Sequence, residues 1–371
     1  MTSTGTGAAP ALSNKRGDAE PEATRSRLTR YMALLRVSGM LPALVGVIVI
    51  GTYVSPAFLT AGNFETVLKL TSVVGLVAIG QTLVILSGAG GIDLSVGAVI
   101  AVAGVTGAIF SGYGMPGFIL GCLAAGAYFG FINGLGVTRG LLQPFIVTLA
   151  TMTIARGVAF YLSQGSPLIV NLPGLDALGS GSVWLLPTPA LVFIVVAVVT
   201  HVYLRYTVGG RELYAIGGTE EAAYLSGVPV ARRRMLVYVV SGLLAGCAAI
   251  LLTSFTASAD ANAASGYELS AIAAVVVGGT ALSGGQGGII GTMIGVLIIA
   301  LTGNILNLAN VDPFMQLIVN GLIVLVAVSL EARGKSAGSR EGRRRLMGLA
   351  TMYAVLALGG LTVALYLAPT P

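Results

Sequence analysis

The sequence predicts an all-α protein, a polytopic bundle of transmembrane helices, and three observations lead to this prediction. Hydrophobic residues make up 55% of the 371 residues and charged residues only 9%. A water-soluble domain could not cover its surface with so few charges. Apolar runs of about 20 residues, the length that crosses the hydrocarbon core as a helix, recur along the chain. The 53 glycines suit helices that pack with close backbone approach inside a bilayer.

We expect eleven spans, with a ten-helix core over residues 37–331. An additional helix over residues 348–371 follows a basic cytoplasmic linker, residues 332–347. Residues 1–36 are small, polar and charged, which predicts a disordered basic tail in the cytoplasm. The expected spans lie near residues 37–56, 66–87, 92–112, 116–138, 144–163, 186–206, 235–256, 269–284, 288–306, 314–331 and 348–367.

The positive charges predict the orientation of these helices. Lys and Arg cluster before the first span, around residues 205–234 and around residues 333–345, whereas the loops near 163–185, 257–268 and 307–313 have none. Cytoplasmic loops carry such an excess of Lys and Arg, so the N-terminus is expected in the cytoplasm. The net charge of +6 lies in these loops. This charge therefore does not indicate a nucleic acid as a partner, whereas the apolar composition indicates the lipid bilayer.

Asp93 is the only charged residue between Lys69 and Arg139, and it lies in the glycine-rich run Gly90–Gly97. Glycine weakens helices, and broken backbone at membrane depth is tolerated only where protein buries it or where it lines a cavity. We therefore expect an interrupted helix with Asp93 and Ser95 near the start of a new one. Two interpretations of the carboxylate stay open: a helix N-cap, or a residue of the transport path or its gate.

A second glycine-rich stretch, Leu282–Ile289, resembles Leu86–Ile92 apart from one inserted residue. Transporters built from repeats interrupt their helices at matching places in the two halves. With so many glycines, chance similarity remains the alternative to an internal repeat.

Uncharged polar side chains inside the expected spans are candidates for the substrate path. Such groups suit a neutral, polyhydroxylated solute that must be released as well as bound. For each of them, a hydrogen bond between helices is the alternative interpretation. Together with the charged Asp93, the candidates are Gln81, Asp93, Ser95, Asn133, Thr148, Thr151, Asn304, Asn307, Gln316 and Asn320.

The loop between the sixth and seventh spans predicts a short amphipathic helix on the cytoplasmic side. Thr219 is a suitable N-cap, Glu220 and Glu221 occupy the first turn, and Gly227 closes the helix. Its acidic first turn and small apolar face favour docking into a groove of a soluble partner over lying on lipid headgroups.

Sequence motifs for ATP binding or catalysis are missing from the chain. Ser329 stands where a phosphate-binding loop before Lys335 would need glycine. We find no metal-ligand spacing and no catalytic pair, so we expect neither an enzyme nor a bound cofactor or metal.

Four stretches resemble the ribose-type sugar permeases of bacterial ATP-binding cassette (ABC) importers. They are Gly90–Gly97, Phe145–Met152, Gly210–Pro229, and Val277–Gly285 followed by Gly287 and Gly288. The resemblance covers about residues 38–331. It implies an inner-membrane permease subunit, paired with a second copy or a paralogue, that conducts a pentose, a hexose or a related polyol. An extracytoplasmic binding protein would deliver the sugar, and a separate tandem-domain ATPase would drive its passage.

The same resemblance implies which residues couple the permease to its ATPase. Within the loop Gly210–Pro229, Glu221, Ala222, Ala223 and Gly227 match the start of the family's ATPase-docking loop, and Arg211 and Glu220 are further candidates for coupling. After Gly227 the sequence departs from the wider family pattern, because Val228 and Pro229 replace the later Ile-x-Leu-Pro. The alternative to an importer subunit is a self-sufficient secondary sugar transporter or channel, in which Asp93 would be the only deeply placed acid able to couple ions.

Overall fold

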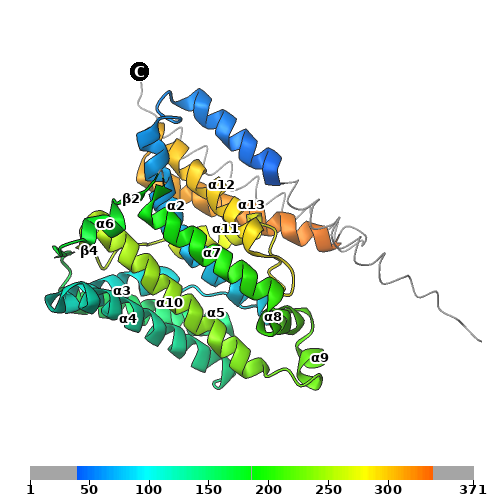
Figure 1. Ribbon diagram of the computed structural model, residues 1–371. Coiled ribbons are helices and arrows are strands. Elements are labelled where there is room, and N and C mark those ends of the chain that lie inside the picture. Colours follow the sequence, from blue (N-terminus) through cyan, green and yellow to red (C-terminus); the bar gives the residue numbers. More distant parts are fainter. Residues whose placement is uncertain (1–39, 185, 337–371) are drawn as a thin grey trace, which may run out of the picture. The chain divides into compact units, whose positions relative to one another are not determined.

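The computed structural model describes residues 40–336 apart from residue 185 (Figure 1). The expected N-terminal tail, most of the linker and the expected eleventh span lie outside these residues. The described part is mostly helical and contains two small antiparallel sheets. In one sheet β1 (Leu168–Ile169) pairs with β4 (Ser258–Ala259), and in the other β2 (Ser182–Val183) pairs with β3 (Leu186–Pro187).

The long helices lie where the apolar runs predicted them. Each of the first ten expected spans overlaps one helix of the structure. These are Met40–Val54, α2 (Ala61–Leu86), α3 (Val96–Phe110), α4 (Gly114–Thr138), α5 (Pro144–Ser163), α7 (Thr188–Tyr206), α10 (Val230–Thr256), α11 (Tyr267–Val277), α12 (Ile289–Leu308) and α13 (Pro313–Ser336). Shorter helices are the 3₁₀ turn η1 (Ser111–Tyr113), α6 (Leu175–Gly179), α8 (Val208–Gly218) and α9 (Glu220–Leu225).

Six helical segments of the described chain are long and apolar enough to cross a membrane. They are α2, the stretch Val96–Thr138 in which a short turn joins α3 to α4, α5, α7, α10 and α12. Shorter apolar helices cover Met40–Val54, Tyr267–Val277 and Phe314–Ile323. The protein is therefore a polytopic membrane helical bundle, as its composition predicted.

The centre of the bundle is formed by α10, against which α2, α3 and α4 all pack. In its most apolar window α2 is 78% buried, whereas α5 is only 28% buried and α7 33%. The exposed sides of α5 and α7 carry Ile154, Val195 and Val199. Apolar side chains facing outward from the bundle are what a lipid environment requires.

Small residues allow α4 and α10 to approach each other closely. A Cβ atom on Gly126 would lie 3.1 Å from the Cα atom of Gly246, and one on Gly130 would lie 3.1 Å from the Cα atom of Gly242. These pairs place the two helices antiparallel, with backbones in contact, which is a packing that membrane helices favour. The end of α4, at Thr138, therefore lies beside the beginning of α10.

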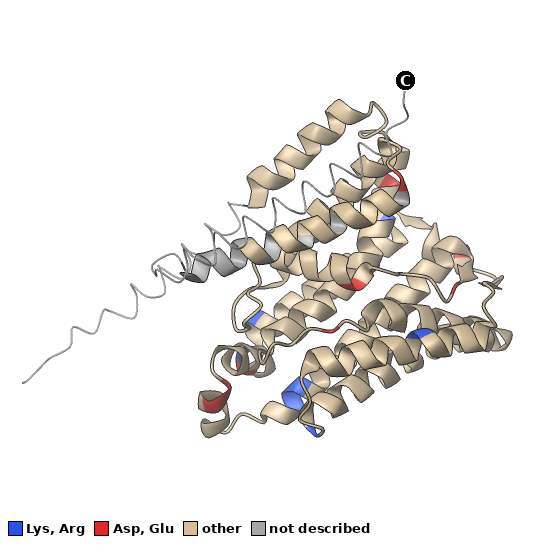
Figure 2. Cartoon of the chain, turned by 180° about the vertical axis from the view of Figure 1, so that it is seen from behind, with Lys and Arg blue, Asp and Glu red and all other residues tan. Residues whose placement is uncertain are grey.

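The two ends of the bundle differ in charge. Figure 1 shows α8 and α9 at one end of α7 and α10, and α6 with the short strands at the other. Basic residues gather at the end with α8 and α9: Arg211 lies on α8, Arg205 at the end of α7, and Arg232–Arg234 at the start of α10. Figure 2 shows that charged positions are few along the helices. The end with α8 and α9 is the one that the charge pattern predicts to be cytoplasmic.

Candidate functional site

The predicted interruption lies between α2 and α3. Gly88, Ala89 and Gly90 all adopt left-handed backbone conformations, with φ of +73°, +54° and +66°. The chain then turns back along α2, so that the backbone N–H of Asp93 donates to the side-chain amide of Gln81 at 3.3 Å. Because Gln81 lies five residues before the end of α2, the segment that leads into α3 runs back beside α2 as far as Asp93.

Asp93 is 1% exposed, and its carboxylate holds three segments together. Its Oδ1 accepts the backbone N–H of Ser95 at 3.0 Å and the Ser95 hydroxyl at 2.6 Å. The same oxygen accepts from Asn133 of α4 at 3.4 Å, and Oδ2 accepts from the Ser241 hydroxyl of α10 at 3.1 Å. The N-cap residue of α3 is Ser95, so the prediction that Asp93 itself is the N-cap was wrong by two positions. Asp93 still binds a backbone N–H at the helix start, as expected for a carboxylate there.

Most of the neighbouring path candidates join this cluster. Asn133 also donates to the Ser95 hydroxyl at 2.8 Å, and the Thr148 hydroxyl of α5 donates to the Ile92 carbonyl at 3.2 Å. Thr151 is buried one turn further along α5. We call Gln81, Asp93, Ser95, Asn133, Thr148 and Ser241 the Asp93 cluster. Its members bond across helices and are fully or almost fully buried, which agrees with the interhelical alternative.

The remaining path candidates lie elsewhere. Asn304 of α12 forms a reciprocal amide pair with Asn63 at the start of α2, with N–O distances of 2.7 and 3.0 Å. Gln316 donates to Asn307 at 2.8 Å. The side chain of Asn320 lies outside the part of the structure that is described. The ten candidates therefore do not form one site, and the partner Asn63 was not predicted.

The loop between α7 and α10 contains two helices, α8 and α9, which we call the connector. The predicted helix after Thr219 is confirmed, because α9 begins at Glu220 and Gly227 follows it with φ of +83°. The sequence did not predict α8, which Thr207 caps by accepting the backbone N–H of Gly210 at 3.1 Å. Two large side chains of α9 face outward: Tyr224 is 71% exposed and Leu225 77%.

An ion pair ties the connector to the helices. Arg234 of α10 is only 8% exposed, and it donates to the Glu220 carboxylate at 2.8 and 3.1 Å. Its guanidinium also donates to the Ser87 carbonyl, at the end of α2, at 3.3 Å. The hydrogen bonds from Arg234 hold the pKa of Glu220 below its ordinary value. A second ion pair joins Glu212 of α8 to Arg233.

Both glycine-rich stretches meet the connector at backbone level, in a set that we call the glycine junction: Gly88, Gly217, Gly284 and Gly285. A Cβ atom on Gly88 would lie 2.8 Å from the Cα of Gly217, and one on Gly284 would lie 2.6 Å from the Cα of Gly88. The Gly285 N–H donates to the Leu86 carbonyl at 3.2 Å, and the Tyr214 hydroxyl of α8 donates to the Gly287 carbonyl at 2.9 Å. The two resembling stretches thus lie side by side against the end of α8.

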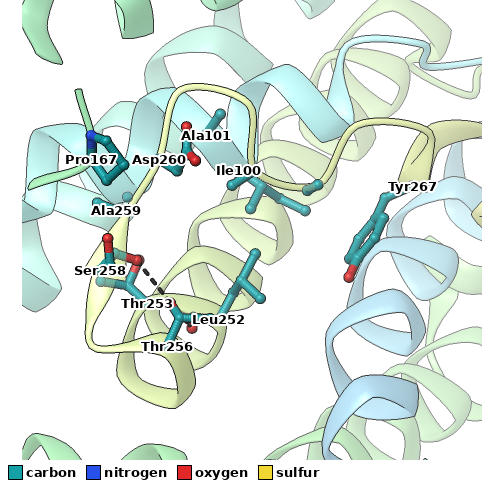
Figure 3. Close-up of a pocket in the computed structure, with 13 residues that line it drawn as sticks. Ile100, Ala101, Pro167, Leu252, Thr253, Thr256, Ser258, Ala259, Asp260 and Tyr267 are labelled. Carbon is teal, nitrogen blue, oxygen red and sulfur yellow. Dashed lines mark hydrogen bonds between the residues drawn. The ribbon is translucent and has the colours of Figure 1, made fainter. Parts of the chain in front are cut away.

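A cavity of about 300 Å³ lies at the opposite end of the bundle, where β4 and the start of α11 meet α3 and α10 (Figure 3). Its polar lining consists of Thr253, Thr256, Ser258, Asp260 and Tyr267. None of the residues predicted from the sequence lines this cavity. The only signal that could have pointed to it is the polar loop around Asp260, which stands between two apolar spans.

Comparison with known protein families shows which family this chain belongs to. Residues 63–328 match the family described as branched-chain amino acid transport system / permease component. The chain belongs to this permease family. It is therefore a multi-pass membrane permease component of an ABC transporter, whose ATPase is a separate subunit, and this part of the predicted resemblance is confirmed.

Curated relatives of the permease cover most of its length. It is 43% identical over 319 residues to the ribose import permease protein of Bacillus subtilis, which covers 85% of this chain and 98% of the relative. It is 40% identical over 295 residues to the Escherichia coli ribose import permease protein, covering 78% and 91%. The L-arabinose transport system permease protein of Escherichia coli is 38% identical over 277 residues, covering 74% and 83%. No solved structure matches the chain.

Proposed function

We propose that the permease forms the membrane path of an ABC importer for a small neutral sugar, a pentose, a hexose or a related polyol. The observation that carries this proposal is the 43% identity to a ribose import permease along almost the whole of that protein. The L-arabinose permease, at 38% identity, supports the same class of substrate. An extracytoplasmic binding protein would deliver the sugar, and a separate tandem-domain ATPase would supply the energy.

The assembly that we propose is a pair of permease subunits, identical or paralogous, with their N-termini in the cytoplasm. Each would have ten core helices and one additional C-terminal helix. The basic residues around the connector support this orientation, because cytoplasmic segments carry most Lys and Arg. The exposed face of α9, with Tyr224 and Leu225, is then available to a cytoplasmic ATPase.

In this proposal the connector carries force from the ATPase to the interrupted helices. The ATPase-coupling residues are those expected from the sequence: Arg211, Glu220, Glu221, Ala222, Ala223 and Gly227. A movement of the connector reaches the segment before Asp93 by two contacts. Arg234 links Glu220 of α9 to the Ser87 carbonyl, and the glycine junction links α8 to Gly88. It reaches α12 through the bond from Tyr214 to Gly287. Backbone-to-backbone contacts transmit displacement well because close-packed protein interiors have low compressibility.

In the alternative drawn from the sequence, a self-sufficient secondary transporter would use Asp93 as its ion-coupling group. The carboxylate is buried and accepts four hydrogen bonds, so an arriving ion would have to displace partners that hold α3 in place. This arrangement favours a structural role for Asp93. Its role in a path or gate remains a prediction.

Reconstitution tests the proposed function. The permease is placed in proteoliposomes with the ATPase subunit and the binding protein, and accumulation of labelled D-ribose and L-arabinose is measured with ATP on the ATPase side. We expect accumulation only with all three components and ATP. Accumulation by the permease alone, driven by an ion gradient, would contradict the proposal, and so would failure of the complete set to accumulate any neutral sugar.

A further inference from the structure

The cavity of about 300 Å³ has the size of a small-molecule site and lies far along the bundle from the connector. In Figure 3, Tyr267 stands on one side of it, and Pro167, Ser258 and Asp260 stand on the other. The loops that surround it have no Lys or Arg in the sequence, so the charge pattern predicts that this end faces the outside. We call it the outer cavity.

Its lining combines hydrogen-bonding groups with apolar surface. Ile100 and Leu252 supply apolar walls, and the ring of Tyr267 adds a flat face. Within the described residues, neither the Thr253 hydroxyl nor the Tyr267 hydroxyl forms a hydrogen bond to another protein group. Asp260 uses Oδ1 to accept the Asn262 N–H at 2.8 Å, which leaves Oδ2 for a ligand. A sugar offers the matching surface, because its hydroxyls line an edge and its C–H groups form an apolar face.

The charge of the outer cavity selects among small solutes. Its described lining contains the Asp260 carboxylate and has no Lys or Arg. A carboxylate accepts hydrogen bonds from hydroxyl groups, whereas it repels phosphate and carboxylate groups. Arg156 does not line the cavity, and its guanidinium bonds the Ala261 and Ala263 carbonyls. Neutral polyols therefore suit the lining better than sugar phosphates or amino acids, whose anionic groups would find no cationic side chain in the described lining.

The wall that carries Asp260 is held in place by contacts from two directions. The Arg156 guanidinium of α5 donates to the Ala263 carbonyl at 3.0 Å and also to the Ala261 carbonyl. On its other side, the pairing of β4 with β1 fixes the Ser258–Ala259 backbone. A site whose walls are fixed before binding loses less entropy when it binds a ligand.

From these observations we infer that the outer cavity is a binding subsite for a neutral sugar within the permease itself. A sugar released by the binding protein would occupy it before passing further into the membrane. This inference rests on the proposed function and adds a place and a set of contacts to it: Asp260 and the hydroxyls of Thr253 and Tyr267 on the polar side, and the Tyr267 ring on the apolar side.

Protection from labelling tests the subsite directly. Ser258→Cys places a thiol in the lining, and Ser180→Cys places one in an exposed position of the same end outside the cavity. The complete importer in nanodiscs is treated with a membrane-impermeant maleimide while D-ribose or D-ribose 5-phosphate is titrated. We expect D-ribose to slow labelling of Ser258→Cys several-fold in a saturable manner, with no effect on Ser180→Cys. The phosphate ester should protect far less.

Second variants in the Ser258→Cys background test the contacts. Thr253→Val and Tyr267→Phe each remove one hydroxyl and keep the shape, so each should raise the half-protecting concentration of D-ribose roughly threefold to tenfold. Thr106→Val is the matched control, because its hydroxyl bonds within α3 to the Val102 carbonyl and does not line the cavity. Two results would contradict the proposed subsite. One is sugar uptake by the importer while D-ribose leaves the labelling rate of Ser258→Cys unchanged. The other is an equal rise of the half-protecting concentration in Thr253→Val, Tyr267→Phe and Thr106→Val. Absence of uptake for every neutral sugar would instead overturn the proposed function.

Discussion

Alanine substitutions at Gly88 and Gly90 distinguish two effects: the loss of packing at the glycine junction, and the strain of a left-handed backbone. Both residues lie in the turn between α2 and α3, and both have left-handed backbone, with φ of +73° and +66°. Only Gly88 is packed against other segments. A Cβ atom on Gly88 would lie 2.8 Å from the Gly217 Cα of the connector, whereas a Cβ atom on Gly90 would have nothing within 4 Å.

The expected magnitudes follow from this difference. Alanine with positive φ costs about 1–2 kcal/mol of folding free energy at either position. At Gly88 the connector must also recede, because ordinary contact begins near 3.4 Å and the new atom would stand at 2.8 Å. Overpacking of this kind costs about 1–3 kcal/mol more. Gly88→Ala should thus lower the free energy of unfolding by about 2–5 kcal/mol, and Gly90→Ala by about 1–2 kcal/mol.

The functional comparison uses the reconstituted importer, with sugar uptake and ATP hydrolysis measured in the same vesicles. We expect Gly90→Ala to keep the ratio of sugar transported to ATP hydrolysed. Gly88→Ala should lower this ratio severalfold even when only folded, membrane-inserted protein is counted, because the connector no longer seats against the interrupted helix. Equal ratios in the two variants would refute the reasoning that the glycine junction transmits the movement.

Three further outcomes are expected. Glu221→Lys reverses an exposed charge of α9, so it should abolish co-purification of the ATPase subunit while membrane insertion stays intact; unchanged co-purification would remove α9 from its proposed role. Asp93→Ala leaves buried donors without an acceptor, which should cost about 3 kcal/mol of stability and lower uptake or folded yield; a silent substitution would exclude both a structural role of the carboxylate and a role in the path or gate. The pKa of Glu220 is lowered by Arg234, so their bond stabilises the fold at neutral pH and is lost only as the pH falls through that lowered pKa. The melting-temperature difference between wild type and Glu220→Gln should accordingly be constant above about pH 5 and shrink below it, and a difference that changes between pH 6 and 8 would contradict this assignment.

Local patterns were enough to predict the long helices and the interruption at Asp93. Runs of apolar residues give the length of each span, and the glycines around Asp93 indicate the break, because both effects depend on residues close together in sequence. The start of α9 after Thr219 was predicted for the same reason. In contrast, α8 was not predicted. Glycine lowers helix propensity, and this helix contains four glycines: Gly209, Gly210, Gly217 and Gly218.

Contacts between distant segments could not be predicted from these patterns. Gly88 and Gly284 stand almost 200 residues apart in sequence, and their similar surroundings did not indicate that they touch. The bridge from Arg234 to Ser87 and the Asn63–Asn304 pair are likewise products of packing. The nine uncharged path candidates looked alike in sequence, yet the partners described for them differ, because each bond depends on which helices become neighbours.

The proposed docking of the connector on a cytoplasmic ATPase is tested by photo-crosslinking in native membranes. A photoreactive amino acid replaces Tyr224, which is 71% exposed on α9, and the importer is assembled in cells with its ATPase subunit. We expect irradiation to join the permease to the ATPase, with position 224 protected from impermeant reagents added outside the cell. Labelling of position 224 from outside, or a crosslink to an extracytoplasmic protein in place of the ATPase, would contradict the proposal that this end of the permease receives the energy of ATP hydrolysis.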